Sequence, residues 1–200
     1  TFDPETGERI KVDNGISRYQ DVFGEVLLDL ARKNPSVVGI TPAMATGCGM
    51  NRLAKEIPER FYDVGIEEEH AVTFAAGLAA GGMKPFCNIY SSFSQRAYDQ
   101  ILHDVALQEL PVVLCLDRGG LVGEDGATHH GCYDMSAYRS IPGAVIAAPK
   151  DELELKNMMY SAMLAETGPY IIRYPRGYGE GVDWQSPEYQ SLESGKGEKV

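Results

Sequence analysis

The stretch FYDVGIEEEHAVTFAAGLAAGGMKPFCNIYSSFSQRAYDQILHDVALQELPVVLCLD, residues 61–117, alternates between short apolar runs and segments long enough for helices. Three of its runs have the aliphatic and aromatic content of buried strands: FYDVG (61–65), PFCNIY (85–90) and PVVLCLD (111–117). Between them lie an alanine-rich segment at 68–82 and a second segment at 94–108, each the length of a helical crossover. Continuously apolar strands joined by helices predict an α/β fold, with a mostly parallel sheet covered by helices on both faces.

The same alternation extends to both sides of this stretch. Upstream, residues 18–33 carry apolar side chains at helical spacing, and Pro35 ends that helix before the strand-like run SVVGIT (36–41). Downstream, the sequence predicts a short helix at 134–139, a strand at 143–148, a helix at 152–165 and a strand at 169–174. Asp151 and Glu154 form a capping box that marks the start of the helix at 152.

The two ends of the chain differ in composition from its middle. Residues 1–16 and 179–200 are rich in Gly, Ser, Pro, Glu and Lys without sustained periodicity, so we predict that they are linkers. Residues 17–178 then form one domain, which agrees with a hydrophobic content of 44% in a chain of 200 residues. A domain between two linkers indicates a piece of a longer protein, and we expect residues 179–200 to lead toward a further domain.

Charge and cysteine spacing argue against several classes of function. A formal net charge of −11 without any run of Lys or Arg argues against nucleic acid and membrane surfaces as partners. No apolar run approaches the roughly 20 residues of a membrane span, and the first residues lack the profile of a signal peptide, so we expect a cytoplasmic protein. The four cysteines form no CxxC pair, which indicates reduced thiols rather than a disulfide frame or a metal site.

Four segments carry side chains suited to chemistry, and all follow predicted strand ends, where parallel sheets bind ligands. In VGIEEEH (64–70) three carboxylates precede an apolar helix. They indicate either catalysis or the ordinary preference of acidic residues for a helix N-terminus. In the segment 88–104, Arg96 lies in or beside a first helical turn, where the helix dipole disfavours it. A bound anion would account for Arg96, and so would a salt bridge to Asp99.

The other two segments are less specific. DRGGLVGEDGATHHG (117–131) has the glycine content of a mobile active-site loop, and an ordinary connection with solvated histidines is the alternative. His129 and His130 are adjacent, which does not fit metal-ligand spacing. RYPRG (173–177) places two arginines in an acidic protein, either as a cationic site or as surface ion pairs.

Taken in order, these segments resemble one enzyme family. The matching sequences are GIEEEHAVTFAAGLAAGG (65–82), IYSSFSQRAYDQILHDVALQELPVV (89–113), DRGGLVGEDGATHHGCYDMSAYRSIPG (117–143) and RYPRG (173–177). Together they resemble the pyrimidine-binding domain of the 1-deoxy-D-xylulose-5-phosphate synthase family, which is transketolase-like and depends on thiamine diphosphate. The resemblance implies a transferase that condenses pyruvate with D-glyceraldehyde 3-phosphate with loss of CO2, for isoprenoid and thiamine biosynthesis.

The resemblance also implies roles for two residues at the cofactor. Glu68 matches a glutamate that shares a proton with the aminopyrimidine ring and so favours its imino tautomer, which is a general acid-base role. Phe93 matches an aromatic residue that stacks on the same ring. Glu68 is therefore expected to be catalytic and cofactor-binding, and Phe93 cofactor-binding.

A second group of residues is expected at the substrates. Tyr90, Arg96 and Arg176 match residues around the phosphate of the aldehyde. Asp125 and His129 match substrate-facing residues. His129 is also a candidate for proton transfer to the pyruvate-derived intermediate, which makes it the second expected catalytic residue.

Members of the family hold the cofactor between two domains. Its diphosphate and Mg²⁺ bind a separate N-terminal domain through a GDG motif and an asparagine, a combination that this sequence lacks. We therefore expect a fragment that is inactive alone, whose partners are the remaining domains of the parent enzyme, and a homodimer at full length. Alternatives with the same fold are a split transketolase, a β-type subunit of an α-keto-acid dehydrogenase, and a non-catalytic binding domain.

Overall fold

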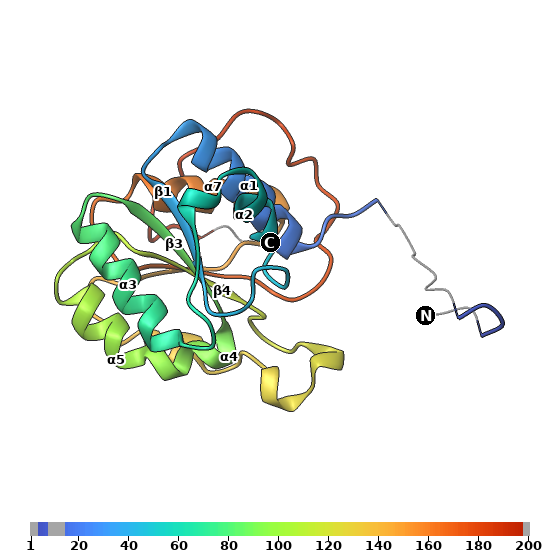
Figure 1. The fold of residues 1–200 in the computed structure, drawn as a ribbon, viewed down its shortest axis with the longest axis horizontal. Helices are drawn as coiled ribbons and strands as arrows, with labels where there is room; N and C mark the ends of the chain where they lie inside the picture. Colours follow the sequence, from blue (N-terminus) through green and yellow to red (C-terminus); the bar gives the residue numbers. More distant parts are fainter. Residues whose placement is uncertain (1–3, 8–14, 198–200) are drawn as a thin grey trace.

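A computed structural model describes residues 4–7 and 15–197, and its centre is a six-stranded sheet (Figure 1). The strands are β1 (Val37–Thr41), β2 (Phe61–Asp63), β3 (Lys84–Tyr90), β4 (Val113–Asp117), β5 (Val145–Ala147) and β6 (Tyr170–Arg173). Their order across the sheet is β2-β1-β3-β4-β6-β5, and every neighbouring pair is parallel. The predicted α/β fold with a parallel sheet is confirmed.

Helices cover both faces of this sheet, as Figure 1 shows. One layer consists of α1 (Tyr19–Lys33), α2 (Asn51–Glu56) and α7 (Glu152–Leu164), with a 3-10 turn η1 (Pro58–Arg60) leading into β2. The other layer consists of α3 (Glu68–Ala80), a helical run over 91–106 and α6 (Asp134–Tyr138). The buried side chains accordingly form two apolar clusters, one under each layer.

The central strands are apolar on both faces because both faces are covered. β1 and β4 are buried along their whole length, and β3 is buried from Pro85 to Tyr90. A strand that is buried on both faces needs no alternation of polar and apolar residues, which explains the continuous apolar runs in the sequence. β2 and β5 form the two edges of the sheet and are partly exposed.

The predicted helix at 94–108 is wrong in its start and in its regularity. Helical structure begins at Ser91, directly after β3, and continues as α4 (Ser91–Ser94), a 3-10 turn η2 (Gln95–Ala97), α5 (Tyr98–Gln100) and a π-helical turn η3 (Ile101–Ala106). Ala97, Ile101 and Val105 are fully buried at intervals of four residues. Contact with the sheet therefore sets the path of this run, and the hydrogen-bond ladder adapts to it.

The remaining predicted elements are confirmed to within a few residues. The helix predicted at 152–165 is α7, and the backbone N–H of Glu154 donates to Asp151 Oδ1 at 2.8 Å, which is one of the two bonds of the predicted capping box. The Glu154 carboxylate accepts from the backbone N–H of Lys150 at 2.6 Å, one residue before the N-cap. The strands predicted at 143–148 and 169–174 are β5 and β6.

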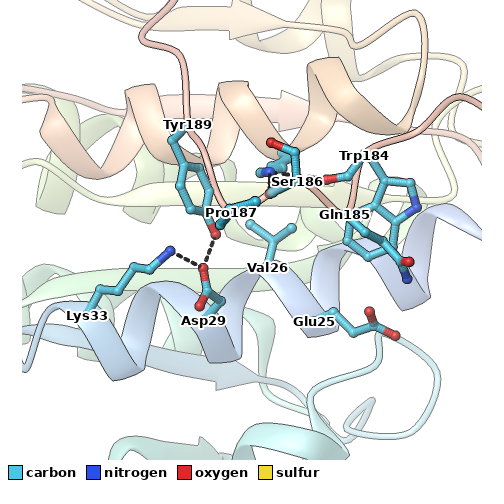
Figure 2. Close-up of a pocket in the computed structure, with 10 residues that line it drawn as sticks. Glu25, Val26, Asp29, Lys33, Trp184, Gln185, Ser186, Pro187 and Tyr189 are labelled. Atoms are coloured by element: carbon cyan, nitrogen blue, oxygen red, sulfur yellow. Dashed lines mark hydrogen bonds and ion pairs between the residues drawn. The ribbon is translucent and has the colours of Figure 1, made fainter.

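The predicted C-terminal linker has no regular structure, but residues 178–197, named here the C-terminal strap, dock on α1 and α7 (Figure 2). Lys156 Nζ donates to the carbonyls of Trp184, at 3.1 Å, and Ser186. Tyr189 hydrogen-bonds Asp29. The side chain of Trp184 is buried, so the C-terminal strap packs as part of the same folded unit as α1 and α7.

The N-terminal linker, predicted at 1–16, lies largely outside the described residues. Among the helices of residues 4–7 and 15–197, none combines the length and apolar character that crossing a membrane requires.

Trp184→Ala should lower the free energy of unfolding of the 200-residue chain by about 3 kcal/mol, because truncating a large buried aromatic side chain leaves a cavity. Leu107→Ala, at a side chain that is 60% exposed, should change it by less than about 0.5 kcal/mol. Urea unfolding followed by circular dichroism measures both values. Equal effects of the two substitutions would mean that the strap is detached.

Candidate active site

The carboxyl ends of three central strands meet at one edge of the sheet, and the residues predicted for chemistry gather there. Tyr90 ends β3, Asp117 ends β4 and Arg173 ends β6. Glu68 opens α3, which follows β2 at the same edge. The topology therefore brings together side chains from four separate segments of the sequence, as the four-segment pattern predicts.

Glu68 is the one residue of the triplet at 67–69 whose side chain is buried. It is 3% exposed, whereas Glu67 is exposed and Glu69 half-buried. Arg96 Nη1 donates to Glu68 Oε1 at 2.6 Å, and the Arg96 side chain remains 47% exposed. The helix dipole alone accounts for acidic residues in a first turn but not for the burial of one of them, so the burial of Glu68 needs a cause of its own.

Phe93 lies at the centre of an aromatic and cationic cluster. The ring of Tyr90 stacks on it with centroids 5.8 Å apart, and the ring of His129 meets it in a T-shaped arrangement with centroids 5.2 Å apart. The Arg96 guanidinium carbon lies 5.0 Å from the Phe93 centroid. Glu68, Phe93, Arg96, Tyr90 and His129 are thus in one continuous set of contacts.

The salt bridge that the sequence offered for Arg96 exists, but with a different partner. Asp99 pairs with His103 at 2.9 Å, and Arg96 reaches back to Glu68 instead. The alternative of an Arg96–Asp99 pair is therefore wrong. Glu68 is too distant in the chain for local spacing to suggest it.

Asp125 and Arg176 meet in a second cluster. Arg176 Nε lies 2.9 Å from Asp125 Oδ2, and Arg176 Nη2 donates to Glu124 Oε1 at 2.6 Å. The hydrogen bond from Arg176 to Glu124 raises the pKa of the guanidinium further, which keeps it charged. Arg173 is different, because it forms an internal ion pair with Asp134 at 2.8 Å and adds no free cation to the site.

The loop that carries Asp125 and His129 is closed at its base. Gly120 and Gly131 exchange two backbone hydrogen bonds, both 2.8 Å long. The loop includes two 3-10 turns, η4 (Gly123–Asp125) and η5 (Ala127–His129). The backbone N–H of Val122 donates to His130 Nδ1 at 3.2 Å, so His130 supports the loop from inside.

Gly131 must be glycine for reasons of space. A Cβ there would lie 2.4 Å from the carbonyl oxygen of Arg118 and 2.4 Å from Ser91 Oγ. By contrast, Gly120, Gly123 and Gly126 have open space but positive φ angles. The close approach at Gly131 fixes the loop against the start of α4 and therefore fixes His129 beside Phe93.

The comparisons with known proteins agree with this geometry. The family described as "Transketolase, pyrimidine binding domain" matches residues 17–180. The chain belongs to this family. Its glutamate segment, aromatic cluster and loop therefore lie in a pyrimidine-binding domain, and the expected fold is confirmed at the level of the family as well as the sheet.

Curated relatives extend over the whole of this pyrimidine-binding domain. The chain is 59% identical over 201 residues to the 1-deoxy-D-xylulose-5-phosphate synthase of Phocaeicola vulgatus, covering 100% of this chain and 32% of that protein. The synthase of Porphyromonas gingivalis is 57% identical over 187 residues, covering 92% and 30%. The resemblance to this synthase family is confirmed, and the chain spans about a third of the length of these relatives.

Solved structures match the pyrimidine-binding domain as well. A split gene transketolase, an inactive beta4 tetramer, superposes with a TM-score of 0.71 at 26% identity, covering 80% of this chain and 52% of that one. Transketolase from Pichia stipitis superposes with a TM-score of 0.74 at 20% identity, covering 82% and 26%. The second match shows the fold alone.

Sequence patterns missed two parts of this domain's site. Arg118 is 7% exposed, has a left-handed φ of 62°, and places its guanidinium carbon 4.0 Å from the centroid of the Tyr90 ring. Its Nη1 donates to the carbonyl of Gly47 at 3.1 Å, which brings the loop after β1 into the site. The charged pair Asp117-Arg118 at the end of an apolar strand was a usable signal for Arg118, whereas Gly47 gave none.

Three of the four cysteines are buried as free thiols. Cys48, Cys87 and Cys115 are buried and unpaired, and burial raises the pKa of the Cys48 thiol to about 12. In the part of the chain that the structure describes, no group of three or more His, Cys, Asp or Glu side chains could hold a metal ion.

Gly131→Ala should lower the free energy of unfolding by about 2 kcal/mol, because the added methyl group overpacks against backbone. Gly77→Ala, in open space on α3, should raise it by about 0.5 kcal/mol, since alanine restricts the unfolded chain. Paired urea titrations of the 200-residue chain give both values. A shift of the same sign for both substitutions would contradict the close packing inferred at the loop base.

Proposed function

We propose that the chain is the pyrimidine-binding domain of a 1-deoxy-D-xylulose-5-phosphate synthase, a transketolase-type transferase that condenses pyruvate with D-glyceraldehyde 3-phosphate and releases CO2. The observation that carries the proposal is the buried Glu68 carboxylate, linked through Arg96 to the ring of Phe93. The relatives that match the whole chain bear the name of this synthase.

Thiamine diphosphate is the cofactor that this reaction needs, and the site residues fit its aminopyrimidine ring. Glu68 offers a carboxylate shielded from water, and Phe93 offers an aromatic face. Arg96 already contacts both groups: it donates to Glu68, and its guanidinium carbon lies over the ring of Phe93 in a cation–π contact. When bound, the cofactor supplies the electron sink for the carbon chemistry.

Glu68 would hold a proton at a nitrogen of the aminopyrimidine ring. A carboxylate shielded from water shares a proton without competition from solvent, which is what general acid-base catalysis by this residue requires. A ring bound beside Phe93 would take over the contacts of Arg96. The Arg96 guanidinium would then be available for an anion, so its pairing in the free domain and a role at the substrate phosphate are compatible.

The substrate roles follow from the second cluster. Arg176, Arg96 and Tyr90 would surround the phosphate of the aldehyde, because one guanidinium group can donate two parallel hydrogen bonds to phosphate oxygens. Asp125 would face the substrate from the loop, held by Arg176 at 2.9 Å. His129 would move a proton at the pyruvate-derived group, since its ring borders Phe93.

The remaining domains of the parent enzyme would complete the site. The diphosphate of the cofactor and Mg²⁺ would bind outside this chain, so the isolated domain would have poor cofactor affinity and no turnover. The full-length protein would be a cytoplasmic homodimer. Within the chain, the C-terminal strap would carry the connection toward the next domain.

A split transketolase is the second candidate, because a split gene transketolase superposes on 80% of the chain. A β-type subunit of an α-keto-acid dehydrogenase and a non-catalytic binding domain share the fold. Product analysis of the full-length enzyme with pyruvate and D-glyceraldehyde 3-phosphate separates these candidates. Only the proposed synthase forms a 1-deoxy sugar phosphate; release of CO2 alone would not exclude an α-keto-acid dehydrogenase, which also decarboxylates its substrate.

Glu68→Ala in the full-length enzyme should reduce kcat by ~10²- to 10⁴-fold, because the general acid-base group is lost. Glu67→Ala is the matched control, since it removes the exposed neighbouring carboxylate and should leave kcat within about twofold. Steady-state release of CO2 from pyruvate measures both. Equal losses in the two variants would remove Glu68 from its role.

Arg176→Ala should raise the KM for D-glyceraldehyde 3-phosphate by about tenfold, since a charge-assisted contact to phosphate is lost. The KM for pyruvate should change by less than about twofold, because that substrate carries no phosphate. Initial rates at varied aldehyde concentration test this. An unchanged KM for the aldehyde would exclude Arg176 from the phosphate site.

A further inference from the structure

Asp117 is a carboxylate at the end of β4 that none of the roles above uses. Its side chain is 1% exposed. Oδ1 accepts the backbone N–H of Arg118 at 2.7 Å, and Oδ2 accepts Arg118 Nη1 at 2.7 Å. Because one carboxylate accepts two hydrogen bonds from one residue, it fixes that residue's backbone and its guanidinium together.

Arg118 in turn touches two of the residues proposed to bind the aldehyde. Its guanidinium carbon lies 4.0 Å from the centroid of the Tyr90 ring, and its Nε lies 3.7 Å from Asp125 Oδ2. Its Nη1 also donates to the carbonyl of Gly47 at 3.1 Å. The orientation of Arg118 therefore decides where Tyr90 and Asp125 lie relative to each other.

Arg118 would not keep this orientation without Asp117. A left-handed φ of 62° is strained for an arginine, so surrounding contacts must hold it. Among the described residues, the buried Arg118 Nε has no hydrogen-bond partner. The contact with Asp117 is the shortest polar contact of the guanidinium.

We propose that Asp117 is a positioning residue for the aldehyde half of the reaction: its carboxylate holds Arg118, and through Arg118 it sets the positions of Tyr90 and Asp125. The inference rests on the proposed function, because it concerns the substrate of that same site. Asp117 acts through another residue and touches neither cofactor nor reacting atoms.

The charge of Asp117 is needed for this role and costs stability. Burial raises its pKa to about 6, and the guanidinium of Arg118 opposes that rise. The charged and titratable groups that face it from the surrounding elements are Arg118, Asp125, Tyr90, Cys48, Cys115 and Tyr174. The folded-state pKa of Asp117 exceeds the ordinary value of 3.8. The contribution of this one group to stability is therefore fully present below pH 3.8 and is lost as the pH rises through about 6.

Asp117→Asn separates a positioning residue from one that serves only to stabilise the fold. The neutral amide removes one buried charge, but it leaves the buried guanidinium of Arg118 without its closest counter-charge, so the unfolding temperature at pH 7 reports the balance of these two effects. The amide also lacks the negative charge that holds the guanidinium of Arg118, so binding of the aldehyde should weaken. Loss of a residue that serves only to stabilise the fold would lower the unfolding temperature and leave both KM values of the folded enzyme unchanged.

The experiment compares wild type, Asp117→Asn and Glu152→Gln. Glu152 is the matched control, because it is a fully buried carboxylate whose partners are the backbone N–H groups of Glu180 and Gly181. In the full-length enzyme, Asp117→Asn should raise the KM for D-glyceraldehyde 3-phosphate by about tenfold at pH 8. The KM for pyruvate, and both KM values of Glu152→Gln, should stay within about twofold.

The pH profile supplies a readout that a structural role would not move. The KM of the wild type for the aldehyde should rise as the pH falls from 8 to 5.5, and the rise should be smaller in Asp117→Asn. The substrate phosphate titrates near pH 6 as well, so the difference between the two proteins at each pH is the quantity that counts.

Thermal unfolding of the 200-residue chain at pH 5 and pH 7 completes the test without any substrate. It shows whether Asp117→Asn is folded at each pH. The proposal is overturned by an unchanged KM for the aldehyde in folded Asp117→Asn, by parallel pH profiles, or by failure of the variant to fold. Absence of synthase product from the wild-type enzyme would instead refute the proposed function, so the two failures are distinguishable.

Discussion

The burial of the Glu68 carboxylate is the constraint on which the rest of the site depends. An ionised carboxylate leaves water at a cost of several kcal/mol unless a cation and hydrogen bonds meet it. Arg96 meets it at 2.6 Å, which requires α3 and the helical run 91–106 to start at the same edge of the sheet. β3 leads into Ser91 without a loop, and this direct junction places Phe93 and Arg96 within reach of Glu68.

Buried and half-buried charges also meet opposite charges at the neighbouring strand ends. Asp117, Arg118, Asp125 and Arg176 follow one another in space with opposite signs. Each cation is shared between two carboxylates, so a change in one group is transmitted to the next. This network fixes the geometry of the site at some cost in stability, because burial raises the pKa of Asp117 and so disfavours its charged form.

The sequence predicted the sheet well because its strands are buried on both faces, and a short, continuously apolar run such as 113–117 is typical of such strands. It misplaced the start at Ser91, since no side chain caps that helix and packing fixed its path. Partners far apart in the chain, such as Glu68 with Arg96, leave no local pattern. The strap was missed because its composition is that of a linker, while Trp184 anchors it through burial.

Binding of an aminopyrimidine to the 200-residue chain tests the central claim most directly. NMR spectra of the ¹⁵N-labelled chain, titrated with a 4-aminopyrimidine that bears the ring substituents of thiamine, report weak binding residue by residue. We predict shifts at the amides of Glu68, Phe93 and His129, and their loss in Phe93→Ala. Shifts confined to the pocket that Val26, Asp29 and Trp184 line between α1 and the C-terminal strap (Figure 2), or none at Glu68 and Phe93 at saturating ligand, would contradict a pyrimidine site at these residues.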